Sequence, residues 1–392
     1  MTEDMRAYLD APHGRLGTHC EKWDMLERHF GRGDLIAMWV ADMDFRTVPQ
    51  VRDALVRRAE HAIYGYTDNG EEDRQAEAEW LLRRHELKVE NDWILYSPGV
   101  VDSLFFCVSA LTKPEDAVLI QPPVYGPFYQ AAKLYDRPLV KSPLIHDDAG
   151  WRMDFDDLEA KFAQGVKLMI LCSPHNPVGR VWRREELQRL VDLARRHGVT
   201  VVSDEIHAEF VFDGLKQTRI LALEGSENCV MLTSATKAFN LAGLRQSSMI
   251  VKNPALRRTL AHAIELSHAS SPNIFGAIAQ TAAYRHGDEW MDAVVEYVRE
   301  NRDYAVEAFN ARLPEIGCKP QEGTYLMWLD FNGLGLSHEA LKDLLVNRAH
   351  VAMNDGLFFG EEGRGWFRMN LATQRANVEK TIDNIYNAIR SR

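Results

Sequence analysis

A short stretch around Lys237 has residue types that suit amine chemistry next to a phosphate. Ser234 and Thr236 precede the lysine, and Arg245 follows it two helical turns later. A lysine that forms a Schiff base must be held still and partly desolvated. The two hydroxyls can donate hydrogen bonds to a phosphate, and the guanidinium of Arg245 can bind one bidentately. Taken alone, the stretch is equally compatible with a surface lysine at a helix start, which is the role of most lysines.

Asp204 ends an apolar run, where a carboxylate is unfavourable unless a cation or a protonated heterocycle pairs with it. One interpretation is a helix N-cap, a frequent role of aspartate. The other is a partner for a protonated pyridine nitrogen, which keeps such a ring electron-withdrawing. His207 follows three residues later and would stand near the same ring, although a single histidine is more often structural.

Three further residues have both a structural and a functional interpretation. Asn176 lies in the rigid Pro-His-Asn-Pro segment, where it could form a turn or donate to a phenolate oxygen. Tyr125 follows two prolines and could be a packing residue or lie flat on an aromatic ring. Arg368 stands in an apolar strand, where arginine is rarely found without an anion, and a substrate carboxylate is the simplest candidate.

The elements that must position these residues alternate between strand and helix. Apolar runs predict strands at 117–120, 166–172, 199–202 and 229–233. Continuous apolar strands separated by helices indicate a mostly parallel sheet that is covered on both faces. Gly99, Asn176, Asp204 and Lys237 each come just after a predicted strand. Because ligands bind beyond the C-terminal strand ends of such sheets, the sequence predicts one shared site.

The chain is long enough for a large core and more than one domain, with 392 residues of which 46% are hydrophobic. We predict an N-terminal arm plus a part of the small domain at 1–48, a large domain at 49–288, and a smaller α/β domain at 289–392. Residues 1 to about 30 are polar and weakly patterned, which indicates an arm rather than a core element.

Charge and composition exclude several functions. The net charge of −11 argues against a nucleic-acid surface, and no apolar run is long enough to span a bilayer. The acidic N-terminus does not resemble a signal peptide, and five scattered cysteines favour a reducing cytoplasm. The sequence contains no metal-binding His or Cys motif, no Gly-x-Ser-x-Gly elbow and no dinucleotide or Walker fingerprint.

The order of these motifs resembles fold-type I pyridoxal-phosphate (PLP) enzymes of the class I/II aminotransferase superfamily. The residues that carry the resemblance are Asn176 in Pro-His-Asn-Pro-Val-Gly, Asp204 in Ser-Asp-Glu-Ile-His, and Lys237 in Ser-Ala-Thr-Lys with Arg245 after it. Within the superfamily, Trp39–Phe45, Tyr64-Gly-Tyr66 and Glu322–Leu326 are similar to the cystathionine β-lyase branch (MalY/PatB-type C–S lyases). The resemblance implies an aspartate aminotransferase-like fold, with a mainly parallel seven-stranded sheet and a smaller C-terminal α/β domain.

The resemblance also implies a role for each residue. Lys237 would be the Schiff-base lysine and the proton carrier, Asp204 the partner of the pyridine nitrogen, and Asn176 a donor to the ring oxygen. The remaining cofactor contacts would be Tyr125 stacked on the ring, His207 near it, and Val100, Val101, Ser234, Thr236 and Arg245 around the phosphate. Tyr64 would reach the phosphate of a neighbouring subunit, which implies a homodimer. Arg368 would bind the substrate α-carboxylate, with Asn176 and Tyr125 beside the substrate.

Two positions differ from the common family pattern. His207 stands where many aminotransferases have a tyrosine, and Thr236 stands where serine is common. The histidine agrees with the lyase branch. The resemblance therefore implies a PLP-dependent C–S β-lyase that converts L-cystathionine or related cysteine S-conjugates to a thiol, pyruvate and ammonia. The alternatives are an aminotransferase and, with less support, a non-catalytic regulatory protein on this fold.

Overall fold

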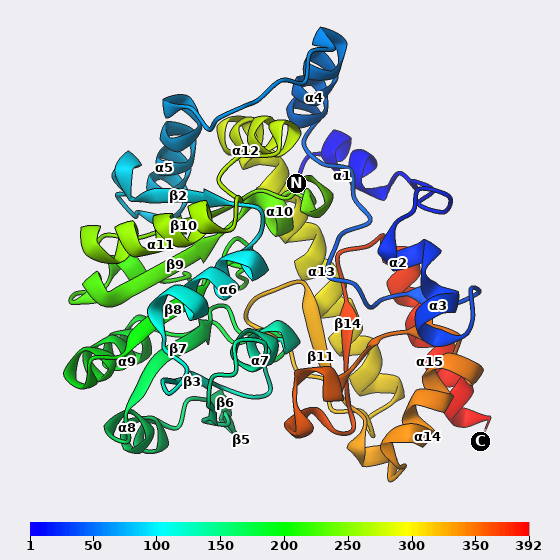
Figure 1. The fold of residues 1–392 in the computed structure, drawn as a ribbon. Helices are drawn as coiled ribbons and strands as arrows, with labels where there is room; N and C mark the ends of the chain where they lie inside the picture. Colours follow the sequence, from blue (N-terminus) through cyan, green and yellow to red (C-terminus); the bar gives the residue numbers. More distant parts are fainter. Residues whose placement is uncertain (392) are drawn as a thin grey trace.

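A seven-stranded sheet forms the centre of the larger part of the molecule (Figure 1). In the computed structural model, which describes residues 1–391, the strand order is β2-β10-β9-β8-β7-β3-β4. The strands are β2 (Ile94–Ser97), β3 (Ala117–Ile120), β4 (Leu139–Lys141), β7 (Val166–Cys172), β8 (Thr200–Asp204), β9 (Cys229–Thr233) and β10 (Ser247–Ile250). Only β10 runs antiparallel to its neighbours, so the prediction of a mainly parallel sheet is confirmed.

Helices cover both faces of this sheet because neighbouring strand residues point to opposite sides. Along β7, Leu168 and Ile170 join one apolar cluster, whereas Met169 and Leu171 join another. The first cluster includes α6 (Val100–Leu111), α7 (Gly126–Lys133) and α11 (Pro254–Leu266), and the second includes α8 (Phe155–Ala163) and α9 (Arg184–His197). Two further large helices, α4 (Pro49–His61) and α5 (Glu71–His85), pack against α12 (Ile274–His286).

Helix α9 illustrates how the sequence determines these elements. Its buried residues recur at Leu187, Leu190, Val191 and Ala194, the spacing of one helical face. Acidic residues occupy its first turn and basic residues its last, which suits the helix dipole. Gly198 ends the helix at a φ of 67°, a left-handed conformation that favours glycine.

The C-terminal part forms a smaller layer around a three-stranded antiparallel sheet. Its strands are β11 (Leu326–Asp330), β13 (Asn354–Asp355) and β14 (Trp366–Asn370), in the order β11-β14-β13. The helices α14 (His338–Asp343) and α15 (Arg375–Arg390) lie beside them, and the 25-residue α13 (Asp288–Arg312) precedes them (Figure 1). The short strand β1 (Ile36–Ala37) pairs in parallel with β12 (Val351–Ala352), which joins the region before residue 48 to the C-terminal part. The exact domain boundaries remain a prediction.

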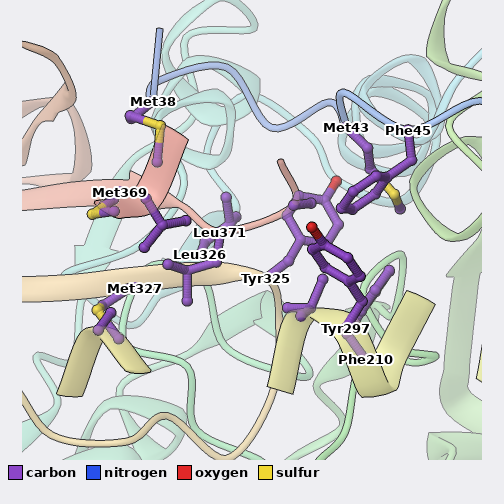
Figure 2. Packing of buried hydrophobic residues seen from close by; sticks show 14 of the residues in the cluster. Met38, Met43, Phe45, Phe210, Tyr297, Tyr325, Leu326, Met327, Met369 and Leu371 are labelled. Carbon is purple, nitrogen blue, oxygen red and sulfur yellow. The ribbon is translucent and has the colours of Figure 1, made fainter. Parts of the chain in front are cut away.

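One apolar cluster connects the N-terminal segment with both parts of the molecule. Figure 2 shows Met43 and Phe45 from the N-terminal segment close to Tyr297 of α13 and to Tyr325, with Phe210 nearby. All five side chains are at most 3% exposed. This shared core fixes the segment around residues 39–45 against the rest of the fold.

Residues 1–30, predicted to be an arm, form three helices that bury three of their side chains. They form α1 (Glu3–Asp10), α2 (Glu21–Asp24) and α3 (Leu26–Phe30). Leu9 and Lys22 are 0% exposed and Leu26 is 1% exposed. The helices α2 and α3 are too short to show an apolar periodicity, and a buried lysine looks like a surface residue in a sequence.

No helix within residues 1–391 combines the length and the apolar character needed to cross a membrane.

Candidate active site

Side chains from five strand ends meet in one pocket of about 200 Å³. Ten of the residues singled out in the sequence line it: Gly99, Val100, Val101, Tyr125, Asn176, Asp204, His207, Thr236, Lys237 and Arg245. They follow β2, β3, β7, β8 and β9, whose C-terminal ends lie at the same edge of the sheet.

Lys237 lies in the short helix α10 (Ala235–Ala238), which starts directly after β9. Its Nζ donates a hydrogen bond of 2.5 Å to the carbonyl oxygen of Ala41. The hydroxyl of Tyr325 donates to the same oxygen at 3.0 Å. Burial lowers the pKa of Lys237 to about 8, although the charge of Asp42 opposes this change. A larger fraction of this amine is therefore uncharged near neutral pH than for an ordinary lysine.

Asp204 ends β8 with its carboxylate buried in the pocket. Its Oδ1 accepts a hydrogen bond from the backbone N–H of Ile206 at 3.1 Å. Within the described residues 1–391 it makes no ion pair. Burial raises the pKa of Asp204 to about 7, with Glu205 adding to the increase and Lys237 opposing it. A cationic partner in the pocket would stabilise this carboxylate.

His207 and Tyr125 add aromatic surface to the pocket. Burial lowers the pKa of His207 well below its usual value, so the imidazole is neutral, and its buried Nδ1 has no partner in the described part of the chain. Its ring packs edge-on against Tyr325, with centroids 5.7 Å apart. Tyr125 precedes α7 and lies edge-on to Phe358 at 5.9 Å.

Arg368 is a buried cation without a carboxylate partner among residues 1–391. Its Nη1 donates to Oδ1 of Asn176 at 2.9 Å, and its Nη2 donates to the carbonyl of Trp39 at 3.1 Å and to Oδ1 of Asn354 at 2.5 Å. Its Nε remains unpaired. Burial lowers the pKa of Arg368 to about 10. A carboxylate ligand is the natural complement of a buried guanidinium with a free N–H group.

The N-terminus of α6 offers an anion site at another side of the pocket. Val100 and Val101 open this helix, where backbone N–H groups lack helical partners. A Cβ atom on Gly99 would lie 2.6 Å from Oδ2 of Asp102, so a larger residue here would require this carboxylate to move.

Two predicted phosphate ligands already have partners in the protein. Nη2 of Arg245 lies 3.0 Å from Oδ2 of Asp102, and the arginine side chain is 60% exposed. Ser234 caps α10, and its hydroxyl donates to the carbonyl of Gln246 at 2.6 Å. Ser234 does not line the pocket, whereas Thr236 does.

Tyr64 lies away from this pocket. Its hydroxyl donates to the carbonyl of Ala59 at 2.8 Å, and the residue is 57% exposed. Its ring is 5.8 Å from that of Phe275. Within one chain, Tyr64 therefore makes no contribution to the pocket that contains Lys237.

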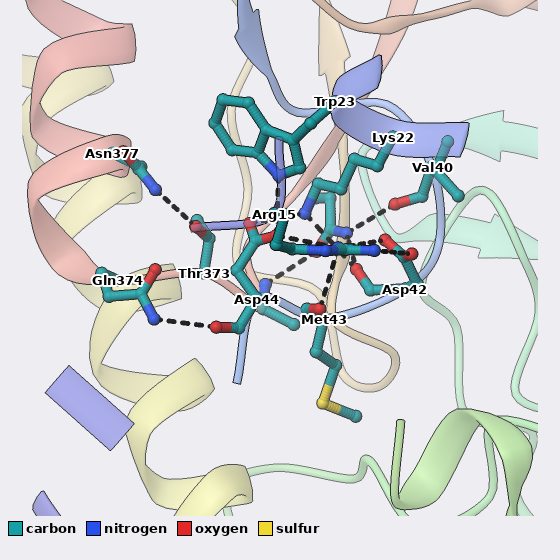
Figure 3. A network of polar contacts seen from close by, with 12 residues as sticks. Arg15, Lys22, Trp23, Val40, Asp42, Met43, Asp44, Thr373, Gln374 and Asn377 are labelled. Atoms are coloured by element: carbon teal, nitrogen blue, oxygen red, sulfur yellow. Dashed lines mark hydrogen bonds and ion pairs between the residues drawn. The ribbon is translucent and has the colours of Figure 1, made fainter. Parts of the chain in front are cut away.

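The segment that carries Ala41 is fixed by an ionic network from the N-terminal region, which supplies Arg15 from the loop after α1 and Lys22 from α2 (Figure 3). Arg15 binds Oδ2 of Asp42 at 2.7 Å and Oδ1 of Asp44 at 2.9 Å. Nζ of Lys22 lies 2.7 Å from Oδ2 of Asp44, and both residues are buried. The network holds the backbone carbonyl that contacts Lys237.

Sequence reasoning missed several residues around the pocket. Ala41 acts through its backbone, so its type gives no signal, and Asp102 was not distinguished from an ordinary first-turn acid. Arg15 and Asp44 are recognisable only as a pair, because they are 29 residues apart and lie in different loops.

Comparisons with known proteins agree with this geometry. The family described as aminotransferase class I and II matches residues 34–385. Cystathionine beta-lyase PatB of Bacillus subtilis (strain 168) is 37% identical over 97% of this chain and 99% of its own length. Protein MalY of Escherichia coli (strain K12) is 34% identical over 96% of this chain and 97% of its own.

A solved structure extends the comparison to three dimensions. Cystalysin from Treponema denticola, whose structure contains a pyridoxal 5'-phosphate cofactor, has a TM-score of 0.94 at 30% identity and covers 98% of both chains. The family match spans most of the chain, and the similarity to these relatives covers nearly all of it. The chain therefore belongs to the class I and II aminotransferase family, in the branch that includes PatB and MalY.

Proposed function

We propose that this protein is a PLP-dependent C–S β-lyase that acts on L-cystathionine or a related cysteine S-conjugate. The observation that carries the proposal is one pocket that contains the Lys237 amine and the buried Asp204 carboxylate, neither of which has an ion-pair partner within residues 1–391. The buried Arg368 guanidinium, which also lacks a carboxylate partner in these residues, donates a hydrogen bond to Asn176 at the wall of this pocket. The names of PatB as a cystathionine β-lyase and of structural neighbours as C–S lyases support the lyase over other reactions.

The residues of the pocket suit PLP. The unpaired Asp204 complements a protonated ring nitrogen, and the α6 N-terminus at Val100 and Val101 complements a phosphate. Arg245, Ser234 and Thr236 would complete the phosphate site, with Arg245 exchanging part of its contact with Asp102. Asn176, Tyr125 and His207 would contact the ring. When bound, PLP stabilises the negative charge that develops at the amino acid Cα.

The residues of the chain then perform the proton transfers. Arg368 binds and orients the substrate carboxylate. The Nζ of Lys237 accepts the Cα proton, for which its lowered pKa of about 8 is suited near neutral pH. The Cβ–S bond breaks, and with L-cystathionine the thiolate of homocysteine leaves with the bonding electron pair. The thiolate then takes up a proton. The remaining 2-aminoacrylate hydrolyses to pyruvate and ammonia.

An aminotransferase is the second candidate, since it uses the same lysine, aspartate and arginine. The two reactions differ in whether a 2-oxo acid acceptor is needed. Purified holoenzyme incubated with L-cystathionine should release pyruvate without any acceptor. Absence of pyruvate together with acceptor-dependent transfer of the amino group would contradict the lyase. A regulatory protein without catalysis would give neither product.

The substrate range needs a separate test. A panel of cysteine S-conjugates, scored for pyruvate release, would show which thioether the pocket prefers. Comparable rates for all conjugates would indicate that Arg368 and the amino group supply most of the recognition.

We further propose that the active unit is a homodimer in which Tyr64 reaches the phosphate site of the other subunit. Its exposed ring and the exposed neighbours Ile63 and Tyr66 support this arrangement. Dimer mass in solution, and weaker cofactor retention in Tyr64→Phe, are the expected results. A monomer with full activity would contradict the proposal. A cytoplasmic location is part of the same proposal, and the five free thiols are compatible with it.

A further inference from the structure

A second and larger cavity lies between the two parts of the molecule. Its volume is about 450 Å³, and none of the residues assigned to the active site lines it. One side is the hairpin of β5 (Ile145–Asp147) and β6 (Gly150–Arg152), and the other is the face of the small sheet that carries Trp328 and Trp366. We call this space the junction cavity, defined by His146, Trp151, Gln321, Trp328 and Trp366.

The aromatic walls of the junction cavity form two flat layers that meet at an angle. His146 stacks on Trp151 with centroids 4.2 Å apart and an interplanar angle of 15°. Trp328 stacks on Trp366 at 5.5 Å and 14°. The ring planes of Trp151 and Trp366 differ by 66°, with centroids 5.7 Å apart. Trp151 and Trp366 remain partly exposed although three large aromatic side chains meet here. Such a corner offers stacking surface and edge contacts to a flat ring.

Two nearly buried side chains of the cavity have unsatisfied polar atoms. Gln321 and Trp328 are each 6% exposed. Neither Nε2 nor Oε1 of Gln321 has a partner within residues 1–391, and the same holds for Nε1 of Trp328. Buried polar groups are nearly always hydrogen-bonded, so these three atoms lack an expected partner. None of them is accessible to solvent, so the Gln321 side chain must rotate before its amide can face a ligand in the cavity. The Gln321 amide offers one donor group and one acceptor, which a ring with an adjacent donor and acceptor would match.

The backbone is shaped around Gln321. Gly179 also lines the cavity, at a φ of +70°, and a Cβ atom there would lie 2.4 Å from Cβ of Gln321. The side chain of Gln321 therefore occupies space that only glycine leaves open.

Charges at the rim do not favour a strongly charged ligand. Asp148 and Asp330 bring two negative charges and Lys319 brings one positive charge, and none of the three makes an ion pair within residues 1–391. Arg180 is neutralised by Glu186 and Glu322 at 2.9 and 2.8 Å.

We propose that the junction cavity is a second ligand site, separate from the pocket of Lys237, that binds a flat heteroaromatic ring with an adjacent hydrogen-bond donor and acceptor. Nucleobases are the class of compound with this edge. The ring stacks at the Trp151–Trp366 corner, and the Gln321 side chain rotates to pair its amide with the polar edge of the ring. Because the walls come from the hairpin and from the small sheet, the bound ring connects the two parts of the molecule.

The test is calorimetric titration of the PLP-loaded enzyme with adenosine, guanosine and uridine, with benzyl alcohol as a ring that lacks the polar edge. At least one nucleoside should bind saturably with one site per chain, and benzyl alcohol should bind at least tenfold more weakly. Trp151→Leu and Gln321→Leu should each weaken nucleoside binding at least tenfold. Trp93→Leu, which removes a tryptophan outside the cavity, should leave it unchanged.

Several outcomes would overturn the proposal. One is that none of the three nucleosides binds saturably up to millimolar concentration. Another is that both cavity variants bind the nucleoside as tightly as the wild type. The third is that benzyl alcohol binds as tightly as the nucleoside. Trp151 lies on a partly exposed hairpin, and its variant is expected to fold. Thermal unfolding of both variants shows whether either fails to fold. If Trp151→Leu does not fold, Gln321→Leu tests the proposal independently.

Discussion

Asp204 and Asp44 are both buried aspartates, but Asp44 has cationic partners and Asp204 has none within residues 1–391. Asp44 contacts Arg15, Lys22 and the indole N–H of Trp23, with all three distances between 2.7 and 2.9 Å. Burial alone would raise the pKa of Asp44, but the charge and hydrogen bonds of Lys22 outweigh it and the pKa is lowered. Asp204 has one backbone donor, and burial raises its pKa to about 7.

The difference separates a structural carboxylate from one that is prepared for a ligand. The paired Asp44 fixes the segment around residues 39–45. This segment places the carbonyl oxygen of Ala41 next to the Nζ of Lys237. The unpaired Asp204 is unfavourable in the ligand-free protein, and a cationic ligand would relieve this cost. Burial alone does not identify an active-site carboxylate; Asp204 is distinguished by lacking an ion-pair partner and by lying in the same pocket as Lys237.

The largest expected effect is on catalysis and comes from replacing Lys237, which lies in the same pocket as the unpaired Asp204. Lys237→Ala should lower pyruvate release from L-cystathionine by a factor of about 10²–10⁴ or more, because the proton carrier is lost. Lys216→Ala, which removes an exposed lysine paired with Glu86, is the matched control and should keep wild-type activity. Substantial activity in Lys237→Ala would assign the proton transfer to another group.

A swap of the two aspartates to asparagine tests the comparison directly. Asp44→Asn leaves Lys22 buried without a full counter-charge and should lower the free energy of unfolding by about 3–5 kcal/mol. Asp204→Asn should leave the stability of the cofactor-free protein equal or higher at pH 8, while activity is largely lost. Denaturant unfolding and pyruvate release measure the two quantities. The reverse pattern would mean that Asp204 is the structural residue.

The pH dependence of stability should have opposite signs at the two sites. The folded pKa of Asp204 is raised, so the folded protein holds an extra proton between pH 3.8 and about 7, and stability falls as pH rises through this range. The folded pKa of Asp44 is lowered, so its contribution is present above the unfolded pKa and disappears as pH falls.

Comparison of the cofactor-free wild type with Asp204→Asn isolates the first effect. Relative to the variant, the wild type should lose on the order of 2 kcal/mol between pH 5 and pH 8. Parallel stability curves for the two proteins would show that the Asp204 carboxylate has a partner in solution.

The smallest expected effect concerns the outer part of the paired cluster. Arg15→Gln removes contacts with both Asp42 and Asp44 and should lower the free energy of unfolding by about 1.5–3 kcal/mol. Arg32→Gln removes a more exposed pair with Asp34 and should cost about 0–1 kcal/mol. Equal costs would show that the Arg15 contacts are no stronger than surface pairs. A Km increase limited to Arg15→Gln would show that the cluster also positions the active site.

The sequence was informative where a signal lies within one element. The runs 166–172 and 229–233 predict strands with the boundaries that the structure has, because both are mainly apolar segments of strand length. The convergence of Asn176, Asp204 and Lys237 followed from the rule that strand ends of a parallel sheet share one edge.

Contacts between distant elements could not be predicted in this way. The burial of Lys22 depends on Asp44, and no local pattern links the two positions. The pairing of Arg245 with Asp102 joins residues 143 positions apart. The unpaired state of Asp204 is likewise a property of the folded surroundings, since a capping aspartate would look the same in the sequence.

The most direct test of the account is the ratio of products formed from L-cystathionine by the holoenzyme without a 2-oxo acid. Thiol and pyruvate should appear in a one-to-one ratio over many turnovers, and Lys237→Ala should form neither at a comparable rate. Amino transfer that requires an acceptor, with no thiol released, would contradict the assignment of this pocket to C–S bond cleavage.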